Sequence, residues 1–448
     1  MRPIFFLAFF ILSIAPATAQ NLSYDQAIDW VLNNHPLAAA ADAVEQRGAA
    51  ELMKYRGALD PKLSLNYDRK DFKGTEYFDY GEAAVEWQSP IALKVAGGYQ
   101  RAEGTYLNAE RTIPSAGQAY LALKLPLLRG LVTDATRIGL KRGELAVDRQ
   151  RALADVIRNE LRYDLAVRYL QWMFAVEVLD LNREIEATIA QRLANYRVLL
   201  EQGDKAAVDT LEAAVYLGTQ QQMVRQAEID LGLAQQAMAE LYWPMTESDT
   251  PLALPAEFLV NLPALGTVEA HPEIRQLALG LADASLSRDL KREQLKPELN
   301  LSYYLLGDGF ALPEVDGSPF ANAYKFGVRA TYPILNRKAR AGAQLGQLKV
   351  LESEAKLGAK TQSLSTKATA YFSAAQQYLD QLGASEVLAG QALRLLAAER
   401  ELFGLGESTQ FVLNQREQAL LKARMGVAKL RFSRAKAVAT YRYLRATW

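Results

Sequence analysis

Apolar positions along this chain follow a helical period over most of its length. No proline interrupts the stretch from residue 137 to 200, and between residues 178 and 200 apolar side chains recur at spacings of three or four, a mean of about 3.67 residues. The stretch 338–402 is again free of proline. A helix over 137–200 would be about 96 Å long at about 1.5 Å per residue, far longer than a globular core requires.

Each long helical stretch runs into a glycine and is followed by a second helical stretch. The first break contains Gly203 and Asp204, and the second contains Gly406, Glu407 and Ser408. Glycine readily adopts the left-handed conformation that ends a helix, and Asp204 or Ser408 is suited to cap the next one. The pattern predicts two helical hairpins, at about 137–243 and about 338–447.

Four shorter runs alternate apolar and polar residues with the period of a strand. They cover residues 62–67, 120–125, 298–303 and 325–332. Each predicted strand has one apolar and one polar face, which is typical both of antiparallel sheets in soluble proteins and of outer-membrane barrels. Lys124, Lys325 and Arg329 fall on polar faces, where they would line the lumen of a barrel or simply keep that face soluble.

The chain contains an internal repeat. Asp60 to Tyr67 (DPKLSLNY) returns 236 residues later as Lys296 to Tyr303 (KPELNLSY), and His35-Pro36 returns as His271-Pro272. We expect a first repeat at 20–243, with strands at about 61–126, a proline-marked connector at 244–264, and a second repeat at 265–448, with strands at about 297–334.

The first repeat is longer between its paired strands. Pro61 to Pro126 spans 65 residues whereas Pro297 to Pro333 spans 36, so the first repeat carries 29 more. This excess covers residues 85–102 and is compatible with another hairpin, either in the sheet or on an outer surface.

The amino terminus and the composition narrow the class of protein. Residues 1–19 have the apolar run and the Ala-Thr-Ala ending of a secretory signal peptide, with cleavage expected before Gln20. Later segments lack a run of about 20 apolar residues, so no transmembrane helix is expected. Cysteine is absent, which excludes disulfides and thiol chemistry. Lysine plus arginine and aspartate plus glutamate both total 51, which gives no indication of nucleic-acid binding.

Catalytic and cofactor motifs are missing from the sequence. It has no G-x-S-x-G elbow, phosphate loop or H-E-x-x-H metal motif. The two histidines, His35 and His271, could in principle form a metal pair, but each precedes a proline, which indicates a helix-terminating turn. The chain is therefore predicted not to be an enzyme and to have no cofactor.

Four strands cannot close a membrane barrel, since the smallest such barrels have eight. Lateral assembly of several copies would solve this, and would also give the long hairpins partners. Three copies would supply about twelve strands.

The order of elements resembles the TolC family of outer-membrane efflux proteins. The resemblance rests on the signal peptide, Asn33-Asn34-His35-Pro36, a strand pair ending at residues 123–130 (LKLPLLRG), a long hairpin, and the same again with residues 332–335 (YPIL). It implies a mainly α fold with a transmembrane β part: a homotrimer in which four strands per chain form a twelve-stranded barrel in outer-membrane lipid, and helical hairpins form a periplasmic tube. The implied partners are a periplasmic adaptor and an inner-membrane transporter.

The resemblance also implies which residues form the periplasmic tip. The family pattern is a glycine followed six residues later by an aspartate, which Gly203 and Asp209 match. In the second hairpin Gly406 matches, but Val412 and Gln415 stand where acidic residues are expected, and Glu407 is a partial substitute if it faces the pore. The candidate gate or adaptor-contact residues are Gly203, Asp204, Asp209, Gly406 and Glu407.

The function that these patterns and the resemblance predict is a passive exit duct of a Gram-negative outer membrane, serving tripartite efflux or type I secretion. The alternative is a soluble periplasmic coiled-coil scaffold or adaptor whose short strands face water.

Overall fold

The structure is a computed structural model that describes residues 24–204, 206–242, 261–311, 317–318 and 323–448. The predicted signal peptide and most of the predicted connector lie outside these residues. The chain divides into two compact units. The hairpin unit comprises the segment up to Ala39 together with 158–266 and 366–448, and the sheet unit comprises 40–157 and 267–365.

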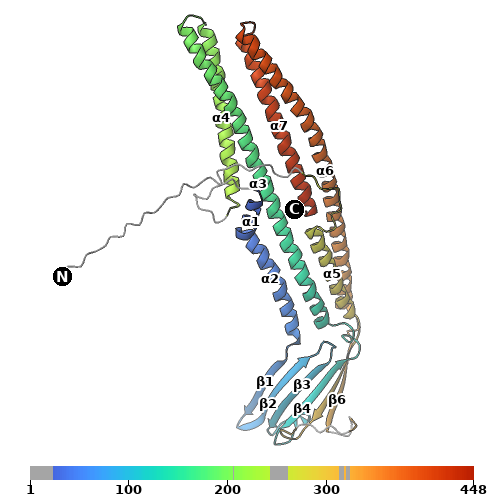
Figure 1. Ribbon diagram of the computed structural model, residues 1–448. Helices are drawn as coiled ribbons and strands as arrows, with labels where there is room; N and C mark the ends of the chain where they lie inside the picture. Colours follow the sequence, from blue (N-terminus) through green and yellow to red (C-terminus); the bar gives the residue numbers. More distant parts are fainter. Residues whose placement is uncertain (1–23, 205, 243–260, 312–316, 319–322) are drawn as a thin grey trace, which may run out of the picture. The chain divides into compact units, whose positions relative to one another are not determined.

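All the regular secondary structure of the hairpin unit is helical in the residues described. Its helices are α1 (Tyr24–Asn34), α3 (Ala135–Glu201), α4 (Ala207–Ala239), α6 (Arg337–Gly404) and α7 (Gln410–Arg445), and α3 and α6 begin in the sheet unit. Figure 1 shows α3 paired with α4 and α6 paired with α7. The two predicted long hairpins are therefore confirmed. None of the described helices is both long and apolar enough to cross a membrane.

The core of the hairpin unit is strongest where α1, α3 and the end of α4 meet. Trp172 is 2% exposed and packs with Tyr169, Leu165, Met238 and Tyr242. Trp172 thus packs between these helices. Farther along, smaller clusters join the helices in pairs: Leu179 with Val224, Ile189 with Leu421, and Leu396 with Leu413 and Leu420. Apolar contacts thus continue along both hairpins.

The sheet unit contains one antiparallel sheet of six strands in sequence order. The strands are β1 (Lys62–Phe72), β2 (Thr75–Gln88), β3 (Lys94–Glu103), β4 (Gln118–Pro126), β5 (Glu298–Leu306) and β6 (Tyr324–Thr331). The predicted number, four, is too low: the 29-residue excess, expected at 85–102, corresponds instead to the whole hairpin of β2 and β3, from Thr75 to Glu103. These two strands lie in the sheet, between β1 and β4.

Small residues explain why β2 and β3 lack a clean alternating pattern. On the apolar face, Ala83 and Gly97 occupy positions where a strand normally shows a large apolar residue, and their neighbours Ala84 and Gly98 are equally small on the polar face. A Cβ added at Gly98 would lie 2.7 Å from the ring of Tyr120 on β4, so the packing of the sheet requires glycine there.

The register places all strands with their apolar residues on one face. Leu65 pairs with Ala83, Leu123 with Tyr303, and Leu301 with Val328. Much of this face is open in the single chain: Leu65 is 74% exposed, and Leu63, Tyr67 and Val328 are also exposed. An apolar face of this kind needs a partner or a lipid environment.

Four helical segments complete the sheet unit: α2 (Pro36–Arg56), α5 (Pro272–Glu293) and the first parts of α3 and α6. Glycines let these helices approach closely, since a Cβ at Gly48 would lie 2.9 Å from the Cα of Val147, and one at Gly346 would lie 3.1 Å from the Cα of Arg288. Arg142 on α3 donates to Asp283 on α5 at 2.7 Å. The pairs α2 and α5, β1 and β5, and β4 and β6 occupy equivalent places in the two repeats.

Candidate functional site

The turns at the ends of the two hairpins have the same backbone design. Gly203 and Gly406 both have φ of 82°. The amide of Asp204 donates to the carbonyl of Leu199, five residues back, and that of Glu407 donates to the carbonyl of Leu402. The amide of each glycine donates a second hydrogen bond back to the helix, and the two bonds together form the Schellman motif that ends a helix. The glycine breaks predicted from the sequence therefore do end α3 and α6.

The helices that follow are not capped as predicted. The N-cap of α4 is Ala206, which has no side-chain cap, and the N-cap of α7 is Thr409, whose Oγ1 accepts from the amide of Val412 at 3.5 Å. Asp204 and Ser408 therefore do not act as N-caps, because each turn continues beyond them before the helix begins. Ser408 is bound elsewhere, as described below.

The acidic candidates of the tip differ in exposure. Asp204 and Glu407 are exposed on the turns, as are both glycines. Asp209 is half-buried in the first turn of α4, where a negative charge is favoured by the helix dipole. Their positions at the hairpin ends agree with a tip, while a gating role remains a prediction.

Replacing Gly203 by alanine is expected to lower the free energy of unfolding by about 1–2 kcal/mol, because the left-handed conformation is costly for a residue with a Cβ. Gly218, in the middle of α4, is the matched control: nothing lies within 4 Å of its added Cβ, so alanine there should stabilise by about 0.5–1 kcal/mol. Chemical denaturation of the two variants measures both. Equal effects of the two substitutions would contradict the assigned turn.

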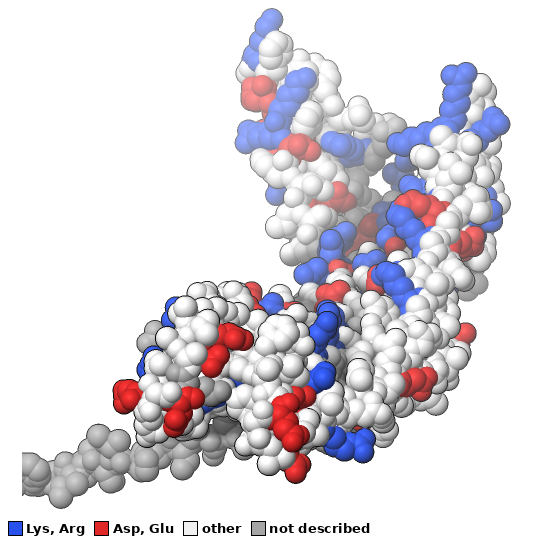
Figure 2. Space-filling view, turned by 90° about the horizontal axis from the view of Figure 1, so that it is seen from above, with Lys and Arg blue, Asp and Glu red and all other residues white. Residues whose placement is uncertain are grey.

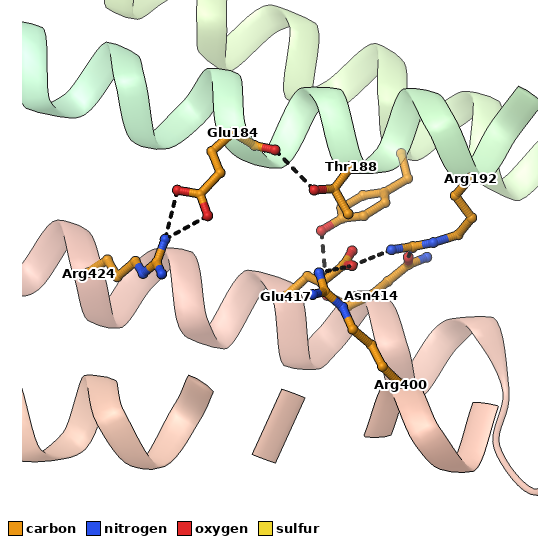
Figure 3. Close-up of polar contacts among 8 residues, drawn as sticks. Glu184, Thr188, Arg192, Arg400, Asn414, Glu417 and Arg424 are labelled. Atoms are coloured by element: carbon orange, nitrogen blue, oxygen red, sulfur yellow. Dashed lines mark hydrogen bonds and ion pairs between the residues drawn. The ribbon is translucent and has the colours of Figure 1, made fainter. Parts of the chain in front are cut away.

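A buried ion network links three helices below the tips. Glu417 on α7 is 0% exposed, and its Oε1 accepts a very short hydrogen bond from Nη2 of Arg192 on α3, which is 11% exposed at its side chain. Nη1 of Arg192 donates to Oδ1 of Asn414 at 2.7 Å, and Arg400 on α6 lies 3.5 Å from Glu417 Oε1. Figure 3 shows these side chains converging from three helices.

Two further contacts surround this network. An exposed ion pair joins Arg424 on α7 to Glu184 on α3 at 2.8 Å (Figure 3). Burial raises the pKa of Tyr216 on α4 to about 12, so its phenol stays protonated next to the carbonyl of Asn414, 3.5 Å away. All four long helices therefore contribute to this region.

The turn of the second hairpin is tied down by a second buried acid. Glu399 on α6 accepts a very short hydrogen bond from the hydroxyl of Ser408 and lies 3.4 Å from Nε of Arg416 on α7. Ser408 follows directly after Gly406 and Glu407, so this contact fixes the turn that carries both candidates. The first hairpin shows no equivalent contact among the residues that the structure describes.

The basic candidates lie in the sheet unit, on its polar face. Lys124 Nζ is 2.9 Å from Glu86 on β2, and Lys94 on β3 is 3.7 Å from the same carboxylate. Lys124, Lys325 and Arg329 line an open hollow of about 710 Å³ on this face. The structure thus brings these three together, in a different unit from the tip residues.

The histidines have structural positions at helix boundaries. His271 Nδ1 accepts from the amide of Glu273 at 3.2 Å and caps α5, while His35 Nδ1 accepts from the amide of Leu37 at 3.1 Å between α1 and α2. Burial lowers the pKa of His35. Within the described parts of the chain, no three His, Asp or Glu side chains are grouped as metal ligands would be.

Charges on the surface are mixed. On the face shown in Figure 2, basic and acidic side chains are interspersed over short distances, as expected from 51 of each sign in the sequence.

The buried network at Glu417 could not be predicted from the sequence, because Arg192 and Glu417 are 225 residues apart and neither stands in a recognisable motif.

No protein-family model and no curated protein matches the sequence. Solved structures do match over nearly the whole chain. The CmeC outer membrane channel of Campylobacter jejuni has 13% identity and a TM-score of 0.68, with 95% of this chain and 86% of that chain covered. The open-state MtrE outer membrane channel of Neisseria gonorrhoeae has 16% identity and a TM-score of 0.68, with 97% and 95% covered.

A third match is the outer membrane protein VceC of Vibrio cholerae, with 13% identity, a TM-score of 0.68, and 94% and 96% of the two chains covered. The fold described above is thus shared with these proteins over 94–97% of this chain. This chain has the fold of the TolC-like outer membrane channels.

Proposed function

We propose that three copies of this chain form a passive exit duct through the outer membrane of a Gram-negative bacterium. The observation that carries the proposal is the fold, which matches outer membrane channels over about 95% of the chain. The predicted signal peptide supports export from the cytoplasm. The duct serves a tripartite efflux or type I secretion system.

The exposed apolar face of the sheet supports the membrane assignment. Leu63, Leu65 and Val328 would be costly to leave in water as one continuous surface, but they suit contact with lipid. The polar face would then surround water, with Lys124, Lys325 and Arg329 lining the lumen. The two edge strands, β1 and β6, would pair between copies, since open edges are not tolerated in lipid.

The hairpin ends would form the periplasmic tip. Three-fold symmetry would turn Asp209 into a ring of three carboxylates, and the exposed turns at Gly203, Asp204, Gly406 and Glu407 would contact a periplasmic adaptor. The sequence has no phosphate loop, so an inner-membrane transporter would supply the energy for export. The network at Glu417 would hold the gate closed, because it joins helices of both hairpins within one chain.

Expression followed by separation of membrane and periplasmic fractions tests the proposal. The protein should be found in the outer-membrane fraction, and on unheated gels and after crosslinking it should migrate as a trimer. Recovery of a monomer from the periplasmic fraction would overturn the proposal in favour of the soluble scaffold.

Replacing Asp209 by asparagine is expected to reduce cation selectivity, because it removes three negative charges from one narrow ring. The reversal potential across a planar bilayer in a salt gradient measures this. Asp230→Asn is the matched control: it is an exposed position far from the hairpin end, towards the C-terminus of α4, and should leave the potential unchanged. Unchanged cation selectivity in Asp209→Asn would show that Asp209 is not its source.

A further inference from the structure

The six strands of the sheet form one continuous membrane-compatible surface. β2 pairs with β1 over eleven positions from Lys62 to Phe72, and β3 pairs with β4 from Lys94 to Gln100. The inserted hairpin β2–β3 is therefore bonded on both sides along the sheet. It is not a flap that lies over one face.

The inserted hairpin has the same two faces as the strands around it. On the apolar face Val85 pairs with Leu63, and Val95 pairs with Leu123. On the polar face Glu86 lies within ion-pair distance of Lys94 and Lys124. Further polar bonds cross the same face, including Tyr120 to Glu82 at 2.7 Å and Gln100 to Gln118 at 2.9 Å. A lipid-facing side and a water-facing side thus run across all six strands as far as Tyr67 on β1, beyond which the lipid-facing side of β1, β2 and β3 carries the charged residues Arg69, Asp79, Arg101 and Glu103.

The two edges of the sheet are suited to each other. Neighbouring strands are all antiparallel and their number is even, so β6 of one copy would run antiparallel to β1 of the next. Their faces also agree: Ser64 and Asn66 on β1 share the polar face with Lys325 and Arg329 on β6, as the register across the sheet shows. The partner whose edge fits is therefore a second copy of this chain.

Dimensions agree with six strands per copy. The sheet unit of each chain holds four helical segments, so three copies hold twelve, which at about 9.5 Å spacing need a circumference of about 115 Å. Eighteen strands about 4.8 Å apart and tilted by about 40° need about 113 Å, whereas twelve need about 75 Å. A ring of eighteen strands can therefore follow a ring of twelve helices without narrowing.

We propose that β2 and β3 are part of the membrane wall, so that three copies close a barrel of eighteen strands through pairing of β6 with β1 of the next copy. This inference rests on the proposed function. Barrels of eighteen strands lie inside the known range and enclose a water-filled channel. Since barrel diameter grows roughly linearly with strand number, the exit is about 1.5 times as wide as one built from four strands per copy. It therefore admits bulkier cargo.

Engineered cysteine pairs test the wall, because the natural chain has no cysteine. In protein isolated from membranes, Ser64→Cys with Ala84→Cys, and Ala96→Cys with Ala122→Cys, should each form a disulfide within one chain, since these residues are paired in the register. Ser64→Cys with Ala122→Cys is the matched control. This pair is equivalent to Asn300 and Arg329 in the second repeat and would be adjacent only if β1 bonded directly to β4.

Formation of the control disulfide in place of the other two would overturn the inference and leave the proposed function intact. Absence of the protein from the membrane fraction would overturn the proposed function itself.

The pairing of β6 with β1 of the next copy, which closes the barrel, is tested by combining Asn66→Cys on β1 with a cysteine at Lys325, Arg329 or Thr331 on β6. At least one combination should give crosslinked species up to a trimer. A ladder that stops at the dimer, or no crosslink in membrane-inserted protein, would contradict the closure.

Deletion of residues 74–102 gives an independent measurement of barrel width. It removes 29 residues, the excess of the first repeat, and leaves β1 antiparallel to β4. Images of detergent-extracted trimers along their axis should show a barrel about 1.5 times wider in the full chain than in the shortened one. Equal diameters would mean that β2 and β3 are outside the wall. If the shortened chain does not assemble, the cysteine pairs decide the question alone.

Discussion

Replacing Glu417 by alanine is expected to lower the free energy of unfolding by about 3–5 kcal/mol, the largest effect of any single substitution at the tip. The reason is the arginine that remains. Arg192 is 11% exposed at its side chain and would keep its charge in a buried site without the carboxylate that now accepts from it. Chemical denaturation of the purified protein measures the loss. Since the network joins both hairpins, the same variant is expected to raise the conductance of the channel in planar bilayers.

Two control variants separate the stability lost because the ion pair is buried from the stability lost because a charge is removed. Glu184→Ala removes a carboxylate that also pairs with an arginine of α7 but is 58% exposed at its side chain, so the loss there should be about 0–1 kcal/mol. The double variant Glu417→Met with Arg192→Met removes both charges and should be more stable than Glu417→Ala alone, because no uncompensated ion remains. If Glu417→Ala and Glu184→Ala lose equal stability, the buried network does not hold the helices together.

The second large effect is expected on the apolar face of the sheet. Arginine at Leu65 or Leu301 should cost about 2–4 kcal/mol if that face meets the hydrocarbon layer, since a charge near the bilayer midplane is strongly disfavoured. The amount of heat-modifiable trimer in the outer-membrane fraction measures the result, and we expect it to fall sharply in both variants.

Asn66→Arg is the matched control for Leu65→Arg. It introduces the same charge one residue along β1, where the side chain lies on the polar face opposite Glu82. It should leave membrane assembly near that of the natural chain. If arginine at Leu65 proves as harmless as arginine at Asn66, the sheet faces water on both sides and the soluble scaffold is favoured.

Helix period, turn chemistry and the repeat were sufficient to predict the parts of the fold that depend on local rules. The long helices α3 and α6 follow from unbroken apolar spacing, and the φ of 82° at Gly203 and Gly406 follows from the choice of glycine at each break. Strands β1, β4, β5 and β6 alternate large apolar and polar residues, so they too could be recognised.

Strands β2 and β3 were not recognised because neighbouring side chains determine their composition. Gly98 is required by the ring of Tyr120, and small residues such as Ala83, Ala84 and Gly97 make the alternation weak. The link between Arg192 and Glu417 was not predictable either: it depends on how α3 packs against α7, across 225 residues of sequence. Arginine and glutamate are also common on helices, so their types give no signal.

Electron cryomicroscopy of the assembly extracted from the outer-membrane fraction tests the central claim most directly. The account predicts three copies around one axis, with the sheets closed into a barrel inside the detergent belt and the helical hairpins forming a tube outside it. A single chain, or an assembly whose sheets lie in water away from the detergent, would contradict it.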